Sequence, residues 1–183
     1  MSKRGKTKAA RRSIVWFAAC AGCAMTVSST SVQADTDQLH GHTLLCTNIE
    51  DPAHAWYRPV RLYVSKERVF LVAGDGTNAA SGTIYEFGKT RSETVGVNPY
   101  KSTATLGQTS IDLQCTITVR DCNICSGKII MITNKHRIFW QNNGWFIKYE
   151  FRQWFPDGTR AAAPYGSSLY TCNVLPGRVN VGQ

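Results

Sequence analysis

The chain has 183 residues, with 21 Lys and Arg against 12 Asp and Glu. Six of the basic residues and none of the acids precede Asp35, so the chain after Ala34 carries a formal charge of only +3. That modest charge argues against nucleic-acid binding, which normally requires a concentrated basic surface. A length of this order suits one globular domain with a single core.

The first 34 residues have the three parts of a secretory signal peptide. A basic head over residues 1–12 is followed by a short apolar run, Ile14–Met25, and by a small residue, Ala34, before Asp35. The apolar run is shorter than the roughly 20 residues that a helix needs to span a bilayer. We therefore expect cleavage near Ala34, a secreted or periplasmic location, and a mature chain without a membrane span.

Three other interpretations of this N-terminus stay open. Arg11 and Arg12 resemble a twin-arginine export signal, and Cys20 lies in a segment that loosely resembles a lipoprotein box. An arginine-rich beginning without acids also fits an organelle transit peptide. A chain that starts at Asp35 and one that starts at a lipidated Cys20 would differ in mass.

After the polar segment 35–42, which we expect to be flexible, short apolar stretches alternate with turn residues, and no helical periodicity is found. Apolar and polar residues alternate strictly over Ile111–Arg120 and again from Trp145 to Arg152, as they do in strands with one buried face. The predicted strands, in chain order, are Thr43–Thr47, Val60–Val64, Val69–Ala73, Thr83–Phe87, Tyr100–Leu106, Ile111–Arg120, Lys128–Thr133, Arg137–Trp140, 145–152 and Leu169–Leu175.

Two turns are predicted between the later strands. Asn142, Asn143 and Gly144 tolerate the positive φ of a hairpin turn, so they are expected to join the strands on either side. Asn134 and Lys135 are predicted to form a second turn, which would reverse the chain after Lys128–Thr133.

Short strands joined mainly by tight turns predict an all-β antiparallel meander. Closure into a barrel removes exposed strand edges most completely. We therefore predict that residues 35–183 form one small up-and-down barrel, which is similar to lipocalins and avidins in architecture alone. A two-sheet β-sandwich is the alternative. The protein is expected to be a monomer.

Five cysteines follow Ala34, and their odd number leaves at least one of them without an intramolecular partner. Cys46 and Cys172 lie on the first and last strands, which a closed barrel places side by side, so a disulfide between them is predicted. Cys122 and Cys125 lie near a hairpin tip, where a local disulfide is favoured. A redox pair is disfavoured because strands, and not a helix N-terminus, flank the two cysteines. A zinc site is disfavoured because no second ligand pair is suitably spaced. Cys115 is then a buried free thiol.

No motif of a known catalytic or phosphate-binding site is present. Asp112 and Glu150 project from the polar faces of their strands and are the conceivable acid pair of a hydrolase, which is the third functional alternative. Charged residues on a solvated strand face are ordinary, so we do not expect an enzyme. No metal and no cofactor is expected.

The leading hypothesis is a non-enzymatic, exported barrel that binds a small apolar ligand or a component of the cell envelope. Trp145, Ile147 and Tyr149 lie on the apolar face of one strand and are predicted to line the interior. Trp56 and Tyr57 are predicted to lie at the mouth of the barrel.

The second hypothesis is a secreted inhibitor or protein-interaction module. It would act through aromatic and basic residues on the opposite face of the same strand, namely Phe146, Lys148, Arg152 and Trp154. The hairpin stapled by Cys122 and Cys125 would add a rigid loop. The two hypotheses place the site on opposite faces of one strand.

Overall fold

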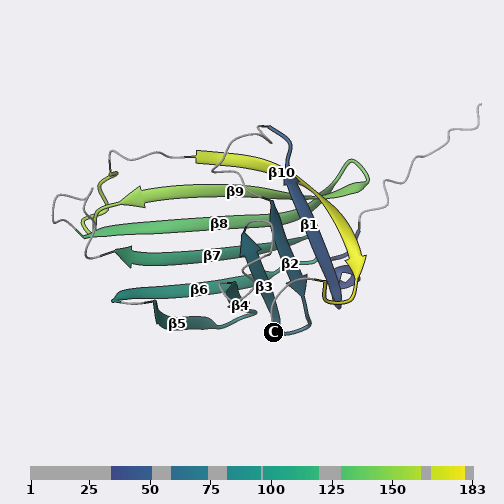
Figure 1. Cartoon of the computed structure of the whole chain (residues 1–183), viewed down its shortest axis with the longest axis horizontal. Helices are drawn as coiled ribbons and strands as arrows, with labels where there is room; N and C mark the ends of the chain where they lie inside the picture. The colour runs from purple at the N-terminus through teal and green to yellow at the C-terminus, as the bar shows by residue number, and fades with distance from the viewer. Residues whose placement is uncertain are drawn as a thin grey trace, which may run out of the picture. The chain divides into compact units, whose positions relative to one another are not determined.

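The structure is a computed structural model that describes residues 34–50, 59–73, 82–95, 97–119, 129–161 and 166–179. Over these residues the chain forms ten antiparallel strands in one sheet that nearly closes into a barrel, which confirms the predicted all-β fold (Figure 1). The strands are β1 (His42–Asn48), β2 (Val60–Val64), β3 (Arg68–Ala73), β4 (Thr83–Glu86), β5 (Thr90–Val95), β6 (Asn98–Leu106), β7 (Ser110–Val119), β8 (Ile130–Gln141), β9 (Gly144–Trp154) and β10 (Gly166–Pro176).

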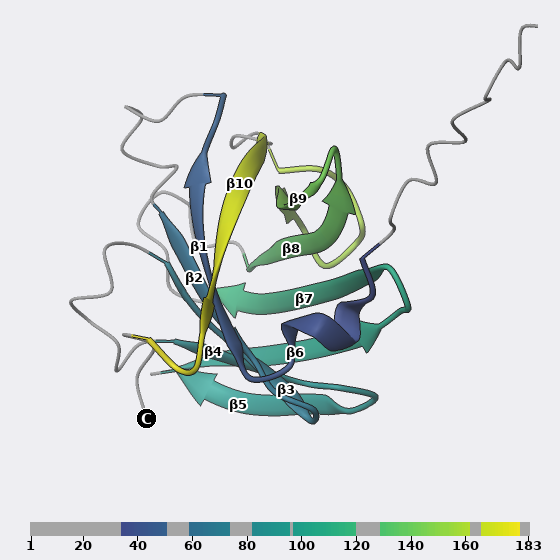
Figure 2. The same ribbon diagram turned by 90° about the vertical axis from the view of Figure 1, so that its right-hand side faces the viewer.

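The strands follow an up-and-down order. Neighbours in the sheet run β4-β3-β2-β1-β10-β9-β8-β7-β6-β5, so the chain closes on itself where β1 pairs with β10. In Figure 1 the short strands β1 to β3 cross in front of the long strands β6 to β9, and Figure 2 shows these two groups from the side. The interior lies between the two groups.

The sheet has two edge strands, β4 and β5, and the barrel closes at a seam between them. There β4 packs against β6, where the Ser102 hydroxyl donates a hydrogen bond to the Ile84 carbonyl at 2.7 Å. Further along the seam the Gly88 amide donates to the Ala104 carbonyl at 3.2 Å. The barrel is therefore closed by a full ladder at β1 and β10 and by a sparser set of contacts at this seam.

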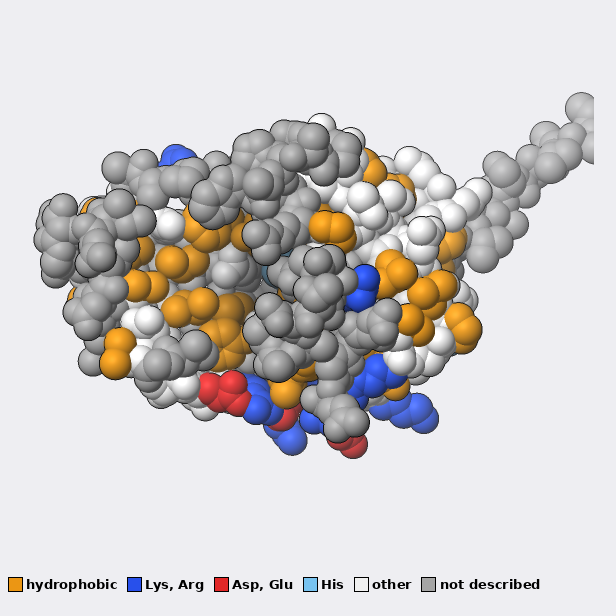
Figure 3. Space-filling view, viewed as in Figure 1, with side chains coloured by type: hydrophobic (Ala, Val, Ile, Leu, Met, Phe, Trp, Pro, Cys, Tyr) orange, Lys and Arg blue, Asp and Glu red, His pale blue; other side chains and the backbone are white. Residues whose placement is uncertain are grey.

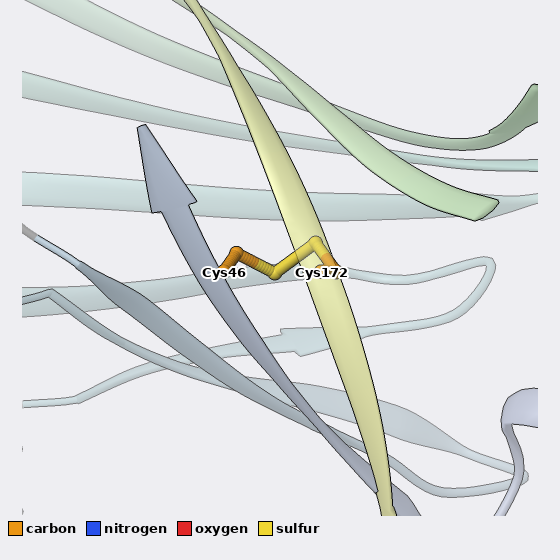
Figure 4. Close-up of a disulfide and its surroundings, with 2 residues drawn as sticks. All are labelled: Cys46 and Cys172. Atoms are coloured by element: carbon orange, nitrogen blue, oxygen red, sulfur yellow. A yellow bond between two sulfur atoms is a disulfide. The ribbon is translucent and has the colours of Figure 1, made fainter. Parts of the chain in front are cut away.

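A disulfide joins the first and last strands. Cys46 lies directly opposite Cys172 in the β1–β10 ladder, and the two sulfurs are bonded (Figure 4). This is the pairing that strand order predicts for a closed barrel. Cys115 is a buried free thiol. Cys122 and Cys125 lie outside the described residues.

A 3-10 helix, η1 (Thr36–Leu39), covers one end of the barrel. Leu39 is fully buried in the core, and the Thr36 hydroxyl donates a hydrogen bond to the Gly107 carbonyl at 2.7 Å. The polar composition of segment 35–42 predicts a flexible end, whereas the structure packs this segment against the turn between β6 and β7. The difference arises because one apolar side chain, Leu39, is enough to anchor it.

The two ends of the barrel differ in the length of their connections. At the end beside η1, which we call the closed end, the strands are joined by the short turns 65–67, 87–89, 107–109 and 142–143. At the opposite, open end the longer connections are 49–59, 74–82, 120–129 and 155–165. The hairpin predicted at Asn142 and Asn143 is confirmed, since both residues have positive φ, of 49° and 59°.

The predicted turn at Asn134 and Lys135 is wrong, because β8 runs without interruption through both residues. Asn134 pairs with Cys115 on one side and with Phe151 on the other. Its side chain accepts a hydrogen bond from the Tyr149 hydroxyl at 2.8 Å, and this contact satisfies an amide that the sequence alone assigns to a turn.

Strand β5 was not predicted from the sequence. Its residues, TRSETV, lack the alternation of apolar and polar positions, because β5 is an edge strand that pairs with β6 alone among the described strands. Arg91 in β5 forms ion pairs with Glu93 and with Glu86 of β4. These charged groups lie at the partly exposed seam.

Removing the Cys46–Cys172 disulfide should destabilise the protein strongly. The bond closes a loop with a sequence separation of 126 residues, for which the chain-entropy model gives about 4–5 kcal/mol. We expect the double variant Cys46→Ala, Cys172→Ala to lose a free energy of unfolding of this order, measured by chemical denaturation. Cys115→Ala is the matched control, with an expected loss of about 1 kcal/mol. Equal losses in the two proteins would contradict the account.

Candidate binding site in the barrel interior

The register of the sheet sets which side chains point inward. At the closed end these side chains are apolar and close-packed, and several are fully buried. They are Leu39, Leu44, Leu62, Val64, Val69, Ile111, Ile138 and Ile147. Antiparallel pairing places Ile111, Ile138 and Ile147 in one row across β7, β8 and β9. This packed group forms the floor of the interior.

Above the floor the inward side chains become polar but uncharged. We call this layer the polar belt, and it consists of Asn48, Tyr85, Tyr100, Ser102, Cys115, Asn134, His136, Tyr149 and Ser168. Part of the belt is internally hydrogen-bonded. Tyr149 donates to Asn134, and the Asn48 amide donates to the Ser168 hydroxyl on the neighbouring β10.

His136 is the most strongly perturbed member of the belt. It is 7% exposed, its ring centre lies 4.9 Å from that of Tyr149, and its Nδ1 has no hydrogen-bond partner in the structure. Burial lowers the pKa of His136 to about 4, because the protonated imidazole would lose its hydration. At neutral pH the ring is therefore uncharged, with a buried nitrogen that has no hydrogen-bond partner.

Two tyrosines and the free thiol make up a second part of the belt. Burial raises the pKa of Tyr100 to about 12, raises the pKa of Tyr85 well above its usual value, and raises that of the Cys115 thiol. All three groups are therefore neutral at physiological pH. Thr83, Ser102 and Cys115 lie close to the Tyr100 hydroxyl, yet this buried oxygen forms no well-aligned hydrogen bond.

Towards the open end most inward side chains are apolar, although Asn98 and Gln153 also face inward there and Tyr100 pairs with Ile117. We call this layer the apolar rim, formed by Ile117, Val119, Ile130, Ile132 and Phe151, and all but Ile130 are only partly buried. Figure 3 shows hydrophobic side chains gathered over the ends of the long strands, beyond the region that β1 to β4 cover. The open end thus presents an apolar wall above a neutral polar layer.

The described interior contains no formal charge outside the seam. The inward positions of β1 to β4 and β6 to β10 hold no Asp, Glu, Lys or Arg among the described residues. On the corresponding face of β5, Arg91 forms ion pairs with Glu86 and Glu93, and all three side chains are about one-third or more exposed to solvent. An ion placed in the belt would find no buried counter-charge there.

The interior residues named from the sequence fall at different depths. Trp145 and Ile147 lie in the buried lower half, where the Trp145 ring packs edge-on against Trp140 at 5.4 Å. Tyr149 belongs to the polar belt. Trp56 and Tyr57 lie outside the described residues. The structure therefore brings one of the named side chains, Tyr149, into the candidate site.

The residues named for surface interaction lie on the outer face of β9 with partners from the same protein. Phe146 stacks on Phe139 at 6.0 Å, whereas Lys148 and Arg152 flank Glu150 at 3.1 and 3.0 Å. Trp154 is half-buried at the end of the strand. Lys148 and Arg152 thus share one carboxylate, that of Glu150, as their ion-pair partner.

The acid pair considered for hydrolysis also lies on the outer face. Asp112 is 3.7 Å from Arg137, and Lys148 beside Glu150 lowers the pKa of that carboxyl. A general acid needs a raised pKa, so the electrostatics give no support to this assignment. Among the described residues no group of three or more His, Cys, Asp and Glu side chains is arranged to hold a metal ion.

The fold and the disulfide define a small antiparallel β-barrel closed by a bond between its first and last strands. No protein-family model matches the chain, and neither curated proteins nor solved structures give a match. Within the described ranges no helix is long and apolar enough to cross a membrane. The candidate site in the barrel interior is therefore assigned from the geometry of this protein alone.

Asn134, His136, Tyr85 and Tyr100 were missed by sequence reasoning. Once β8 is treated as one strand, Asn134 and His136 alternate with Ile132 and Ile138 on its inward face. Polar residues at alternate positions within an otherwise apolar face were the available signal. The predicted turn at Asn134 concealed it.

His136 should make the stability of the protein depend on pH. Its folded pKa, about 4, lies below the usual value of 6.5, so the unfolded chain takes up the proton first as the pH falls. The contribution of the neutral His136 ring to the free energy of unfolding is complete above pH 6.5. It is lost progressively between pH 6.5 and 4, by about 3 kcal/mol in total. The free energy of unfolding of His136→Gln, measured across this range, should lack that component. Identical pH profiles in the two proteins would contradict the burial of His136.

Proposed function

We propose that the protein binds a small, largely apolar molecule in the open half of the barrel, between the apolar rim and the polar belt. The proposal rests on how the inward side chains change along the barrel. The floor is apolar and packed, and the belt above it contains a buried nitrogen without a partner, His136 Nδ1. Beyond the belt the side chains of the apolar rim are partly exposed. Protein-binding faces and ligand pockets expose apolar surface, whereas cores bury it.

The polar belt favours a ligand over a merely structural interior. Buried polar atoms in native proteins are almost always hydrogen-bonded, because an unmade bond costs about 1–3 kcal/mol. His136 Nδ1 and the Tyr100 hydroxyl are exceptions within one interior. A ligand that reaches the belt would supply the missing partners.

Binding should be sensitive to charge on the rim. An uncharged fluorescent dye such as N-phenylnaphthylamine is expected to bind the wild-type protein. Ile132→Glu should weaken this binding by at least about tenfold, since a carboxylate on the inward face would have to be desolvated next to the dye. Dye fluorescence in a titration measures the affinity.

Met131 provides the matched control, because it neighbours Ile132 on the same strand and points to the outer face. Met131→Glu should leave the dye affinity unchanged. Absence of dye binding to the wild-type protein, or equal losses in the two variants, would contradict the proposed site.

We further propose that the protein acts outside the reducing cytosol, after removal of residues 1–34. The Cys46–Cys172 disulfide supports this, because structural disulfides persist mainly in oxidising compartments. The basic head and the short apolar run of the first 34 residues support the same route.

The mass of the protein recovered from the producing cells tests the export route. Without reductant, we expect a chain that begins at Asp35 and a Cys46–Cys172 cross-linked peptide after proteolysis. A chain that retains residues 1–34, or one with both cysteines reduced, would contradict export.

A further inference from the structure

We propose that the ligand is an uncharged amphiphile whose polar head is a hydroxyl or a similar group that both donates and accepts hydrogen bonds. The head would lie in the polar belt and the apolar tail along the rim. This inference rests on the proposed function and names the chemical class of its ligand.

The ligand is uncharged because the site offers no compensation for an ion. None of the described inward positions outside β5 carries an acidic or basic side chain, and the charged groups at the seam, Arg91, Glu86 and Glu93, are already paired with one another and about one-third or more exposed. Moving an unpaired ion from water into such a site costs several kcal/mol. Carboxylates, phosphates and amines are therefore disfavoured.

The head must form hydrogen bonds because two buried polar atoms have no partners. His136 is 7% exposed and Tyr100 is 6% exposed, and His136 Nδ1 and the Tyr100 hydroxyl both lack a partner. A neutral imidazole nitrogen donates or accepts according to its tautomer, and a phenol does both. A hydroxyl head can satisfy either arrangement, whereas an ether can only accept.

The order of the layers sets the orientation of the ligand. The floor below the belt is filled by fully buried side chains such as Ile138 and Ile147, which leave the tail no equivalent path downward. On the inward face of β7, Cys115 in the belt and Val119 in the rim are four residues apart, about 13 Å at roughly 3.3 Å per residue. The tail therefore extends from the belt towards the open end.

Three ligands, each with a chain of ten carbons ending in its head group, separate these requirements. Decanol, decyl methyl ether and decanoate would each be titrated at neutral pH against the bound uncharged dye. We expect decanol to bind about five- to tenfold more tightly than the ether, the value of one net hydrogen bond. We expect decanoate to bind at least about 100-fold more weakly than decanol because its charge must be desolvated.

Variants of the polar belt test whether the preference for decanol over the ether arises there. In the double variant His136→Phe, Tyr100→Phe, decanol should lose its advantage over the ether when both are titrated against the dye, with the dye affinity measured anew for that variant. Because His136 Nδ1 and the Tyr100 hydroxyl form no well-aligned hydrogen bond, this variant should lose at most about fivefold in its folding equilibrium constant, or about 1 kcal/mol of the free energy of unfolding, by chemical denaturation. Tyr63→Phe is the matched control, since the Tyr63 ring lies on the outer face against Arg178, and it should keep the preference for decanol.

The outcomes distinguish the two proposals. If the dye does not bind, the proposed function fails. If the dye binds but decanoate competes as well as decanol, or the ether competes equally in wild type, the ligand class assigned here is wrong. If the double variant keeps the wild-type preference for decanol, the belt is not where the head binds.

Discussion

The pairing of the first strand with the last is the constraint on which the rest of the structure depends. Seven residues of β1 are in register with β10, and the Cys46–Cys172 bond holds the centre of that ladder. With this register fixed, every inward face is fixed as well, because a slip of one residue would turn each side chain to the other face. The sparser seam between β4 and β6 then closes around an interior whose composition is already determined.

Unequal strand lengths explain why one half of that interior is packed and the other is open. Strands β7, β8 and β9 have 10, 12 and 11 residues, whereas β2 and β4 have only 5 and 4. Short strands can cover only part of the inward face of long ones. Where both groups overlap, apolar side chains bury one another; beyond the overlap, Ile117, Ile132 and Phe151 remain partly exposed. Between the two regions lies a neutral polar layer that holds the buried His136.

Much of the fold could be predicted from the sequence because alternation and strand order are local signals. The Ile111–Val119 strand and the position of Cys46 opposite Cys172 followed from them. The site was harder to predict, since Asn134 has the local character of a turn residue and only its contact with Tyr149 makes it part of a strand. Strand β5 lacks alternation because it is an edge strand, and no periodic signal marks it.

Methyl NMR spectra of the isoleucine-labelled protein, recorded while decanol is added, would show whether a ligand binds in the open half of the barrel. Isoleucines occur at every level of the structure, so the spectrum reports where a ligand binds. We expect the Ile117 and Ile132 signals to shift, while those of Ile138 and Ile147 in the packed floor and of Ile84 on the outer face of β4 stay unchanged. Shifts confined to Ile84, or no shifts at any isoleucine, would contradict a ligand site in the open half of the barrel.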